Sequence, residues 1–171
     1  MKKCISFLLC LCILLCICGC AHHVEAPQAP VRFYYPRTMD TIQYTAGSGA
    51  FTYEARESAG YTDNLPYLLN LYFRGPTDPT LQNPFPTATS VTELKIYGNY
   101  AFLTVSDSFA QLTGMELTVA CACLTQTVAA LTGVESLCLR TNTLPFGNDE
   151  QLLLHVSDFL FVDDTAAPTT D

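Results

Sequence analysis

The sequence predicts a domain of the α/β class, of α+β type: a small mixed sheet of about four to six strands with two helices packed on one face. The first observation behind this is a two-residue loop, Gly98-Asn99, between two β-prone runs. The second is a strand, a long helical pattern and another strand in direct succession over residues 100–140. The third is a shorter helical pattern within residues 62–76.

The domain is expected to begin with strands, which a short helix follows. "VRFYYP" (31–36) alternates apolar and more polar residues and stops at a proline, which is typical of a strand. "TIQYTAGSGAFTYEAR" (41–56) has two short β-prone pieces around a Gly-Ser-Gly break and predicts a hairpin. In the segment 62–76, Asp63 or Asn64 is the expected N-cap, a proline lies in the first turn, and Gly75-Pro76 ends the helix.

The clearest local pattern is the hairpin of residues 91–106. Its short loop predicts a register in which Leu94, Ile96, Ala101 and Leu103 share one face. The predicted pairs are Tyr97 with Tyr100, Ile96 with Ala101, Lys95 with Phe102, and Leu94 with Leu103.

A long helix is expected over residues 114–133, closed by Gly133, with the strand "VESLCLR" (134–140) directly after it. Its apolar stripe consists of Leu117, Cys121, Leu124, Val128 and Leu131. A strand, helix and strand in this order predict a right-handed parallel crossover. The segment 146–162 is apolar without clean periodicity, so strand and short helix both remain open. Cys121, Cys123 and Cys138 are expected to be buried free thiols, with Cys138 pointing away from the helix.

The N-terminus has the pattern of an export signal. Lys2 and Lys3 precede an apolar run that ends in Gly19-Cys20, and the run of about 15 residues is shorter than the roughly 20 that a membrane-spanning helix needs. "ICGC" (17–20) resembles the bacterial lipobox, which implies that residues 1–19 are removed and that Cys20 carries a diacylglycerol thioether. Residues 20–30 are then a Pro/Ala-rich tether, residues 31–162 a single domain, and residues 163–171 a disordered tail.

Charge limits the partners. The formal net charge is −8 and no basic run is present, so nucleic acid is not an expected partner. For the same reason the chain is expected to reach the membrane through the lipid on Cys20 and not through electrostatic attraction to lipid head groups. His22 and His23 supply two metal ligands at most, and neither a metal nor another cofactor is expected.

Several segments, in this order and spacing, resemble the GerMN domain of sporulation and spore germination lipoproteins. They are "VRFYYP", "YFRGP", "NPFPTAT", "LTVSDSF" and "TQTVAALTGVESLCLR", and the resemblance covers residues 31–141. It implies a small mixed sheet with helices on one side. It also implies a non-catalytic protein on the outer face of the cytoplasmic membrane that takes part in protein–protein assembly. One copy of the domain is present, and the stretch after residue 141 is longer than the family pattern.

The polar residues that could carry catalysis are explained better by structural roles. Ser106, Asp107 and Ser108 follow a strand and could be combined with His155 as a nucleophile site, but "VSDSF" is typical of turn and cap chemistry. Glu54 and Glu57 could form a carboxylate pair, although a solvated strand or turn explains them as well. The chain is therefore not expected to be an enzyme.

Strand alternation suggests a partner surface. If the apolar strand residues face the helices, the opposite face presents a set of basic and aromatic side chains, which are typical of binding surfaces. The alternatives are a half-solvated face and a face covered by residues 151–162. A second function is also open, in which the lipoprotein binds a small ligand or cell-wall fragment between the sheet and the C-terminal segment. The predicted surface consists of Arg32, Tyr34, Lys95, Phe102 and Arg140, with Cys138 among them.

Overall fold

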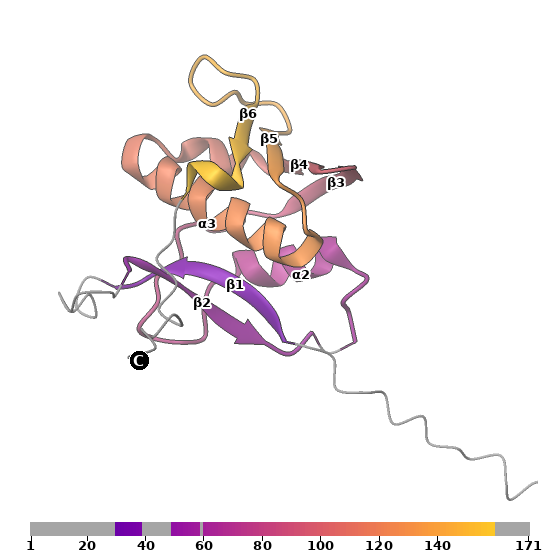
Figure 1. Ribbon diagram of the computed structural model, residues 1–171. Coiled ribbons are helices and arrows are strands. Elements are labelled where there is room, and N and C mark those ends of the chain that lie inside the picture. Colours follow the sequence, from indigo (N-terminus) through magenta and orange to yellow (C-terminus); the bar gives the residue numbers. More distant parts are fainter. Residues whose placement is uncertain (1–29, 39–48, 59, 160–171) are drawn as a thin grey trace, which may run out of the picture.

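The computed structural model describes residues 30–38, 49–58 and 60–159, and it has the predicted α+β fold (Figure 1). The elements in chain order are β1 (Val31–Pro36), β2 (Phe51–Arg56), α2 (Leu65–Phe73), β3 (Val91–Tyr97), β4 (Tyr100–Val105), α3 (Gly114–Thr132), β5 (Ser136–Thr141) and β6 (Leu152–His155). Short 3-10 helices follow β4 (Asp107–Gln111) and β6 (Val156–Asp158).

Four strands form the main sheet in the order β3-β4-β5-β6. β4 and β5 are parallel and the other neighbours are antiparallel, so the sheet is mixed as predicted. The β3-β4 register confirms all four predicted pairs. Gly98, with φ of +57°, takes the left-handed conformation that a two-residue loop requires. α3 makes the predicted crossover between β4 and β5.

The first strand lies elsewhere than expected. β1 pairs with β2 in a separate two-stranded sheet, and the helices lie between this small sheet and the main one (Figure 1). The edge of β1 that lies opposite to β2 is bonded by side chains. The N–H of Tyr34 donates to Thr127 Oγ1 of α3 at 2.9 Å, and its carbonyl accepts from the Tyr72 hydroxyl at 2.7 Å. These bonds replace the strand that would otherwise be needed beside β1.

The hairpin predicted over residues 41–56 is described only in its second half. That half is β2, and it pairs antiparallel with β1 from Val31 opposite Arg56 to Pro36 opposite Phe51. Residues 41–48 lie outside the described residues.

Capping chemistry sets the start of α2 and the end of α3. The side chain of Asn64 accepts a hydrogen bond from the N–H of Tyr67, as one of the two expected N-caps. α3 ends at Gly133, whose φ of +75° gives a left-handed cap. By length and composition α3 could cross a membrane, but here it packs between the two sheets as a core helix.

The core lies on both sides of the helices. Toward the small sheet, Phe33 and Tyr35 contact the ring of Tyr72, with ring centroids 5.3 and 4.9 Å apart. Toward the main sheet, Leu103, Leu124 and Leu139 are fully buried. The other residues of the predicted α3 stripe are either buried or packed against the core. In the described part of the chain Cys121, Cys123 and Cys138 are free and buried, as predicted. For the segment 146–162 the sequence left strand and short helix open. Its described part contains the strand β6, followed by a 3-10 turn.

Candidate functional site

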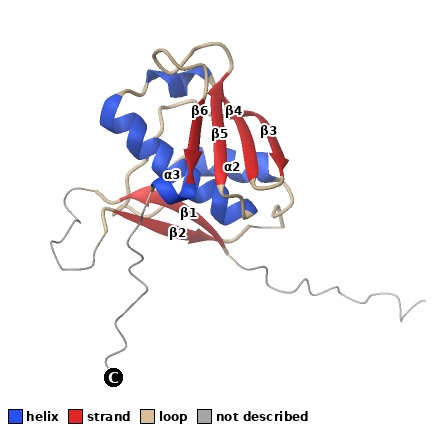
Figure 2. Ribbon diagram, turned by 45° about the horizontal axis from the view of Figure 1, so that its top comes forward, coloured by secondary structure: helices blue, strands red, loops and turns tan. Residues whose placement is uncertain are grey.

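The face of the main sheet that points away from the helices is the main candidate (Figure 2). Strand alternation and register put Lys95, Phe102 and Leu153 in one row across the sheet, with Cys138 between the last two. Several large apolar side chains on it are exposed: Tyr97 by 63%, Leu153 by 55% and Phe102 by 43%. We call this surface the outer sheet face and define it by Glu93, Lys95, Tyr97, Phe102, Arg140 and Leu153.

The charges of the outer sheet face are organised around one carboxylate. Glu93 forms ion pairs with Lys95 at 2.5 Å and with Arg140 at 3.2 Å, while Arg140 Nε also donates to Thr104 Oγ1 at 2.8 Å. The hydrogen bond and charge of Lys95, with a smaller effect of Arg140, lower the pKa of Glu93. The same carboxylate raises the pKa of Lys95. Glu93 and Lys95 therefore remain charged at neutral pH and can meet a partner's charges.

The structure separates the five residues of the predicted surface. Lys95, Phe102 and Arg140 lie together on the outer sheet face. Arg32 and Tyr34 are on β1 in the other sheet, where the Arg32 guanidinium lies 4.8 Å from the Tyr53 ring centroid. The prediction of one shared face for all five is therefore wrong. Alternation along a strand gives the side on which a residue lies, but it does not tell to which sheet the strand belongs.

Sequence reasoning missed three residues of this face. Glu93 and Tyr97 lie on the same side of β3 as Lys95, so the alternation that selected Lys95 could have selected them. Leu153 could not have been found in this way, because residues 152–155 gave no clear strand signal.

The residues considered for catalysis hold the fold together. Ser106 Oγ donates to the carbonyl of Ala88 and accepts from the N–H of Ser90. His155 contacts Ser136 at the start of β5, whereas Asp107 follows the end of β4. Because β4 and β5 are parallel and in register over six residues, these groups lie at opposite ends of the sheet, roughly 16 Å apart at about 3.3 Å per residue.

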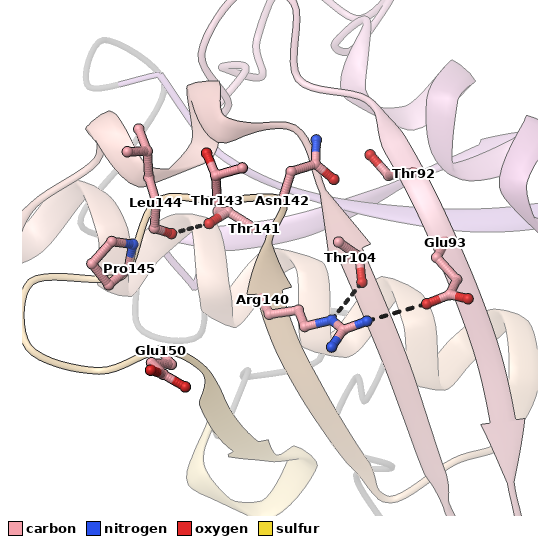
Figure 3. Close-up of a pocket in the computed structure, with 10 residues that line it drawn as sticks. All are labelled: Thr92, Glu93, Thr104, Arg140, Thr141, Asn142, Thr143, Leu144, Pro145 and Glu150. Carbon is pink, nitrogen blue, oxygen red and sulfur yellow. Dashed lines mark hydrogen bonds and ion pairs between the residues drawn. The ribbon is translucent and has the colours of Figure 1, made fainter.

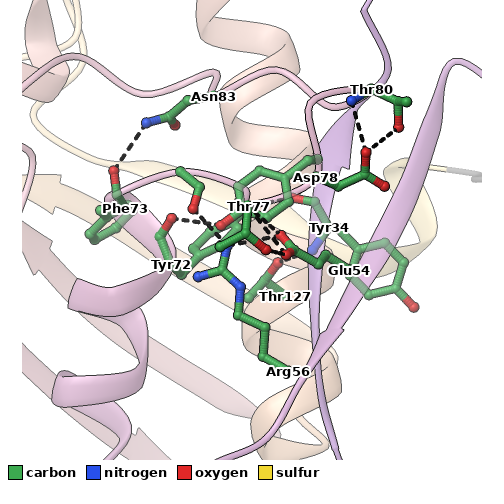
Figure 4. Close-up of polar contacts among 12 residues, drawn as sticks. Tyr34, Glu54, Arg56, Tyr72, Phe73, Thr77, Asp78, Thr80, Asn83 and Thr127 are labelled. Atoms are coloured by element: carbon green, nitrogen blue, oxygen red, sulfur yellow. Dashed lines mark hydrogen bonds and ion pairs between the residues drawn. The ribbon is translucent and has the colours of Figure 1, made fainter. Parts of the chain in front are cut away.

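Glu54 also has a structural role (Figure 4). Its carboxylate accepts hydrogen bonds from Arg56 Nη2 at 2.8 Å and from the N–H and hydroxyl of Thr77. Arg56 donates further to the carbonyl of Gly75 at 2.7 Å. Burial opposes ionisation of Glu54, but the bonds from Arg56 and Thr77 outweigh it and lower its pKa. The cluster ties β2 to the loop after α2.

A cleft of about 650 Å³ opens where β4 and β5 end, beside the loop of residues 142–151 (Figure 3). Arg140 lies in it, with Thr104 and Glu93 on one side and the loop on the other. Asp107 fixes this loop, because its carboxylate accepts bonds from the N–H and hydroxyl of Thr143 and from the N–H of Leu144. Among the described residues, no group of three or more His, Cys, Asp or Glu side chains could hold a metal ion.

The predicted lipid attachment site, Cys20, lies outside the described residues, as do the predicted signal peptide 1–19, residues 20–29 of the tether and the tail 163–171. These predictions rest on the sequence.

No protein-family model and no curated protein matches the sequence. Solved structures similar to the chain include the following two. The first is that of the tandem GerMN domains of the sporulation protein GerM from Bacillus subtilis, with a TM-score of 0.49 and 16% identity; the match covers 77% of this chain and 47% of that one. The second is a candidate lipoprotein from Clostridium perfringens, with a TM-score of 0.43 and 17% identity; the match covers 75% of this chain and 87% of that one. The present chain thus spans about half the length of the first structure, and similarity at this level concerns only the arrangement of the chain.

Proposed function

We propose that this protein is a non-catalytic, membrane-anchored lipoprotein that assembles with another protein of the cell envelope, in sporulation or spore germination. The lipid on Cys20 holds it at the outer face of the cytoplasmic membrane, and the outer sheet face contacts the partner. The proposal draws on the lipobox-like "ICGC" and on the sequence resemblance to GerMN lipoproteins over residues 31–141.

The observation that carries the assembly role is the outer sheet face itself. Tyr97, Phe102 and Leu153 are large apolar groups exposed on a sheet in an acidic protein, and exposed apolar groups gathered on one surface are typical of interaction sites. Lys95 and Arg140 add the chain's scarce cations around Glu93. Aromatic and basic side chains of this kind dominate the binding energy of many protein interfaces.

Photocrosslinking tests the surface directly. A benzoyl-phenylalanine in place of Phe102 should form an adduct with one envelope protein in intact cells, and Lys95→Glu in the same chain should weaken that adduct. The matched controls are a crosslinker in place of Tyr67, which is exposed on α2, and Arg32→Glu, which makes the same change of charge on the other sheet. Equal adducts at both positions, or equal effects of the two charge reversals, contradict the proposal.

Fractionation tests the anchor. Cys20→Ala should move the protein from the membrane to the soluble fraction, and labelled palmitate should appear on the native chain but not on the variant. Cys18→Ala is the matched control, because the lipobox resemblance assigns no lipid to that sulfur. A Cys20→Ala protein that stays on the membrane contradicts the anchor.

The second function left open by the sequence, binding of a small ligand, is favoured by one observation: the cleft beside the loop 142–151.

A further inference from the structure

The cleft at the ends of β4 and β5 has the size of a ligand site. Its volume of about 650 Å³ falls inside the range of roughly 300–1,000 Å³ that is common for small-molecule pockets. Three strands and the loop 142–151 supply its walls (Figure 3). The side chains that the argument uses are Thr92, Glu93, Thr104, Arg140, Asn142 and Glu150.

The balance of charges at the cleft favours a neutral ligand. Arg140 is the one cation among the lining residues, all of which are described, and the lining also contains two carboxylates, Glu93 and Glu150. Glu93 already neutralises Arg140 through a 3.2 Å ion pair. Lys95 pairs with the same Glu93 carboxylate at 2.5 Å, so the two carboxylates and the two cations at the cleft balance, and no excess charge selects an ionic ligand.

The hydrogen-bonding groups of the lining favour a ligand with hydroxyl groups. The guanidinium of Arg140 only donates, the carboxylates of Glu93 and Glu150 only accept, and the amide of Asn142 does both. A ligand hydroxyl also both donates and accepts, so several hydroxyls on one molecule can be satisfied by this mixture. Thr92, Asn142 and Glu150 are exposed and accessible for such bonds.

An aromatic surface lies next to the polar groups. Phe102 is on the same face of β4 as Thr104, two residues earlier and thus roughly 6.6 Å along the strand. Its ring is 43% exposed and contacts the ring of Tyr97 edge-on at 5.9 Å between centroids. The apolar C–H face of a sugar ring can pack on such a ring while its hydroxyls reach the cleft.

The wall formed by the loop is held in place without a ligand. Asp107 binds the backbone and hydroxyl of Thr143, and the hydroxyl of Thr141 donates to the carbonyl of Leu144. Because these bonds exist already, ligand binding does not carry the entropy cost of ordering the loop.

We infer that this cleft binds a neutral, polyhydroxylated ligand, a short glycan. Asn142, Glu150 and Arg140 bind its hydroxyls, and Phe102 packs against a sugar ring. This site adjoins the surface proposed for the protein partner and shares Phe102 with it, whereas Lys95, Tyr97 and Leu153 do not line the cleft.

Titration of the full-length chain tests this inference, in a zwitterionic detergent without a sugar head group. The probes are a β-1,4-linked N-acetylglucosamine tetramer and a neutral oligomannose, each followed by calorimetry and by amide NMR shifts. At least one of them should bind and shift the amides of residues 104 and 140–150. Asn142→Ala combined with Glu150→Gln should weaken that binding at least tenfold. Asn148→Ala, in the same loop, and Glu57→Gln, on an exposed glutamate, are the matched controls and should leave it unchanged.

The outcomes separate the sources of the glycan and the two proposals. Sedimentation with purified peptidoglycan alongside tetramer binding identifies the cell wall as the source, whereas binding of oligomannose alone identifies another glycan. Absence of binding to both probes, binding that survives the double variant, or binding of inorganic phosphate in their place overturns the inference. Leu153→Ala, on the outer sheet face and outside the cleft lining, should leave glycan binding intact, and Asn142→Ala should leave the partner adduct intact, so failure of one proposal is distinguishable from failure of the other.

Discussion

Asp107, directly after β4, accepts a 2.8 Å hydrogen bond from the N–H of Thr143 and a 2.6 Å bond from its hydroxyl, although the two residues are 36 positions apart. A third bond comes from the N–H of Leu144. This one carboxylate therefore joins the end of β4 to the loop that leaves β5, and it shapes the cleft of the outer sheet face.

Removing this carboxylate should loosen the loop. In Asp107→Ala the amides of Thr143 and Leu144 lose their acceptor, and their hydrogen exchange should become roughly tenfold faster while exchange in α3 is unchanged. Amide exchange measured by NMR checks this. Asp149→Ala, an exposed aspartate of the same loop, should have no such effect, and similar acceleration in both variants would contradict the assigned role.

Acid should loosen the loop in the same way. The hydrogen bonds from Thr143 lower the pKa of Asp107 below its ordinary value. A carboxyl whose folded pKa is lowered stabilises the fold above its unfolded pKa of about 3.9, and this contribution falls as the pH drops from there through the folded value. Protection of the Thr143 amide should thus be constant between pH 7 and about 5 and decline below about 4. The Asp107→Asn chain should not show this decline.

The hydroxyl of Tyr72 should contribute to stability, because burial keeps it neutral and it is the donor to the Tyr34 carbonyl at the edge of β1. Tyr72→Phe keeps the packing of the ring and removes this bond, so the free energy of unfolding should fall by about 1–2 kcal/mol. Urea denaturation followed by circular dichroism gives the value. Tyr67→Phe, on the exposed side of α2, is the control and should change little. If the Tyr72→Phe chain is as stable as the native one, this hydrogen bond does not help to hold β1 apart from the main sheet.

Truncating a side chain should lower the free energy of unfolding much more on the inner face of the main sheet than on the outer sheet face. Leu139 is fully buried against the helices, and Leu139→Ala should cost about 2–5 kcal/mol of unfolding free energy. Leu153 is exposed on the outer sheet face, and Leu153→Ala should stay within about 0.5 kcal/mol. Thermal and urea denaturation of both variants checks this. A large loss for Leu153→Ala would show that the outer sheet face is covered in the folded protein.

The three domain thiols should be unreactive. Burial raises the pKa of Cys121 to about 12, and it raises the pKa of Cys123 and Cys138 as well. The thiolate is the reacting species, so iodoacetamide at pH 8 should leave all three unmodified in the native protein and modify them in urea. Peptide mass spectrometry reads each site separately. Rapid native labelling of Cys138 would show that Gln151, 3.4 Å from its sulfur, does not stay over it.

The sequence by itself determined the local structure. The Gly98-Asn99 loop set the β3-β4 register, Asn64 and Gly133 set helix ends, and the apolar stripe set the buried face of α3. These features depend on residues close together in the chain, where turn geometry, capping bonds and helical spacing act directly. The same alternation brought Lys95, Phe102 and Arg140 to one face.

Only the tertiary structure decided which sheet β1 joins and where the cleft forms. β1 is apart from the main sheet because Thr127 and Tyr72, 93 and 38 positions from Tyr34, supply its missing backbone partners. The cleft depends on the bond between Asp107 and Thr143, and β6 became a strand only by pairing with β5. No local pattern encodes such contacts, because side chains far apart in the chain satisfy the same hydrogen-bonding groups as a neighbouring strand would.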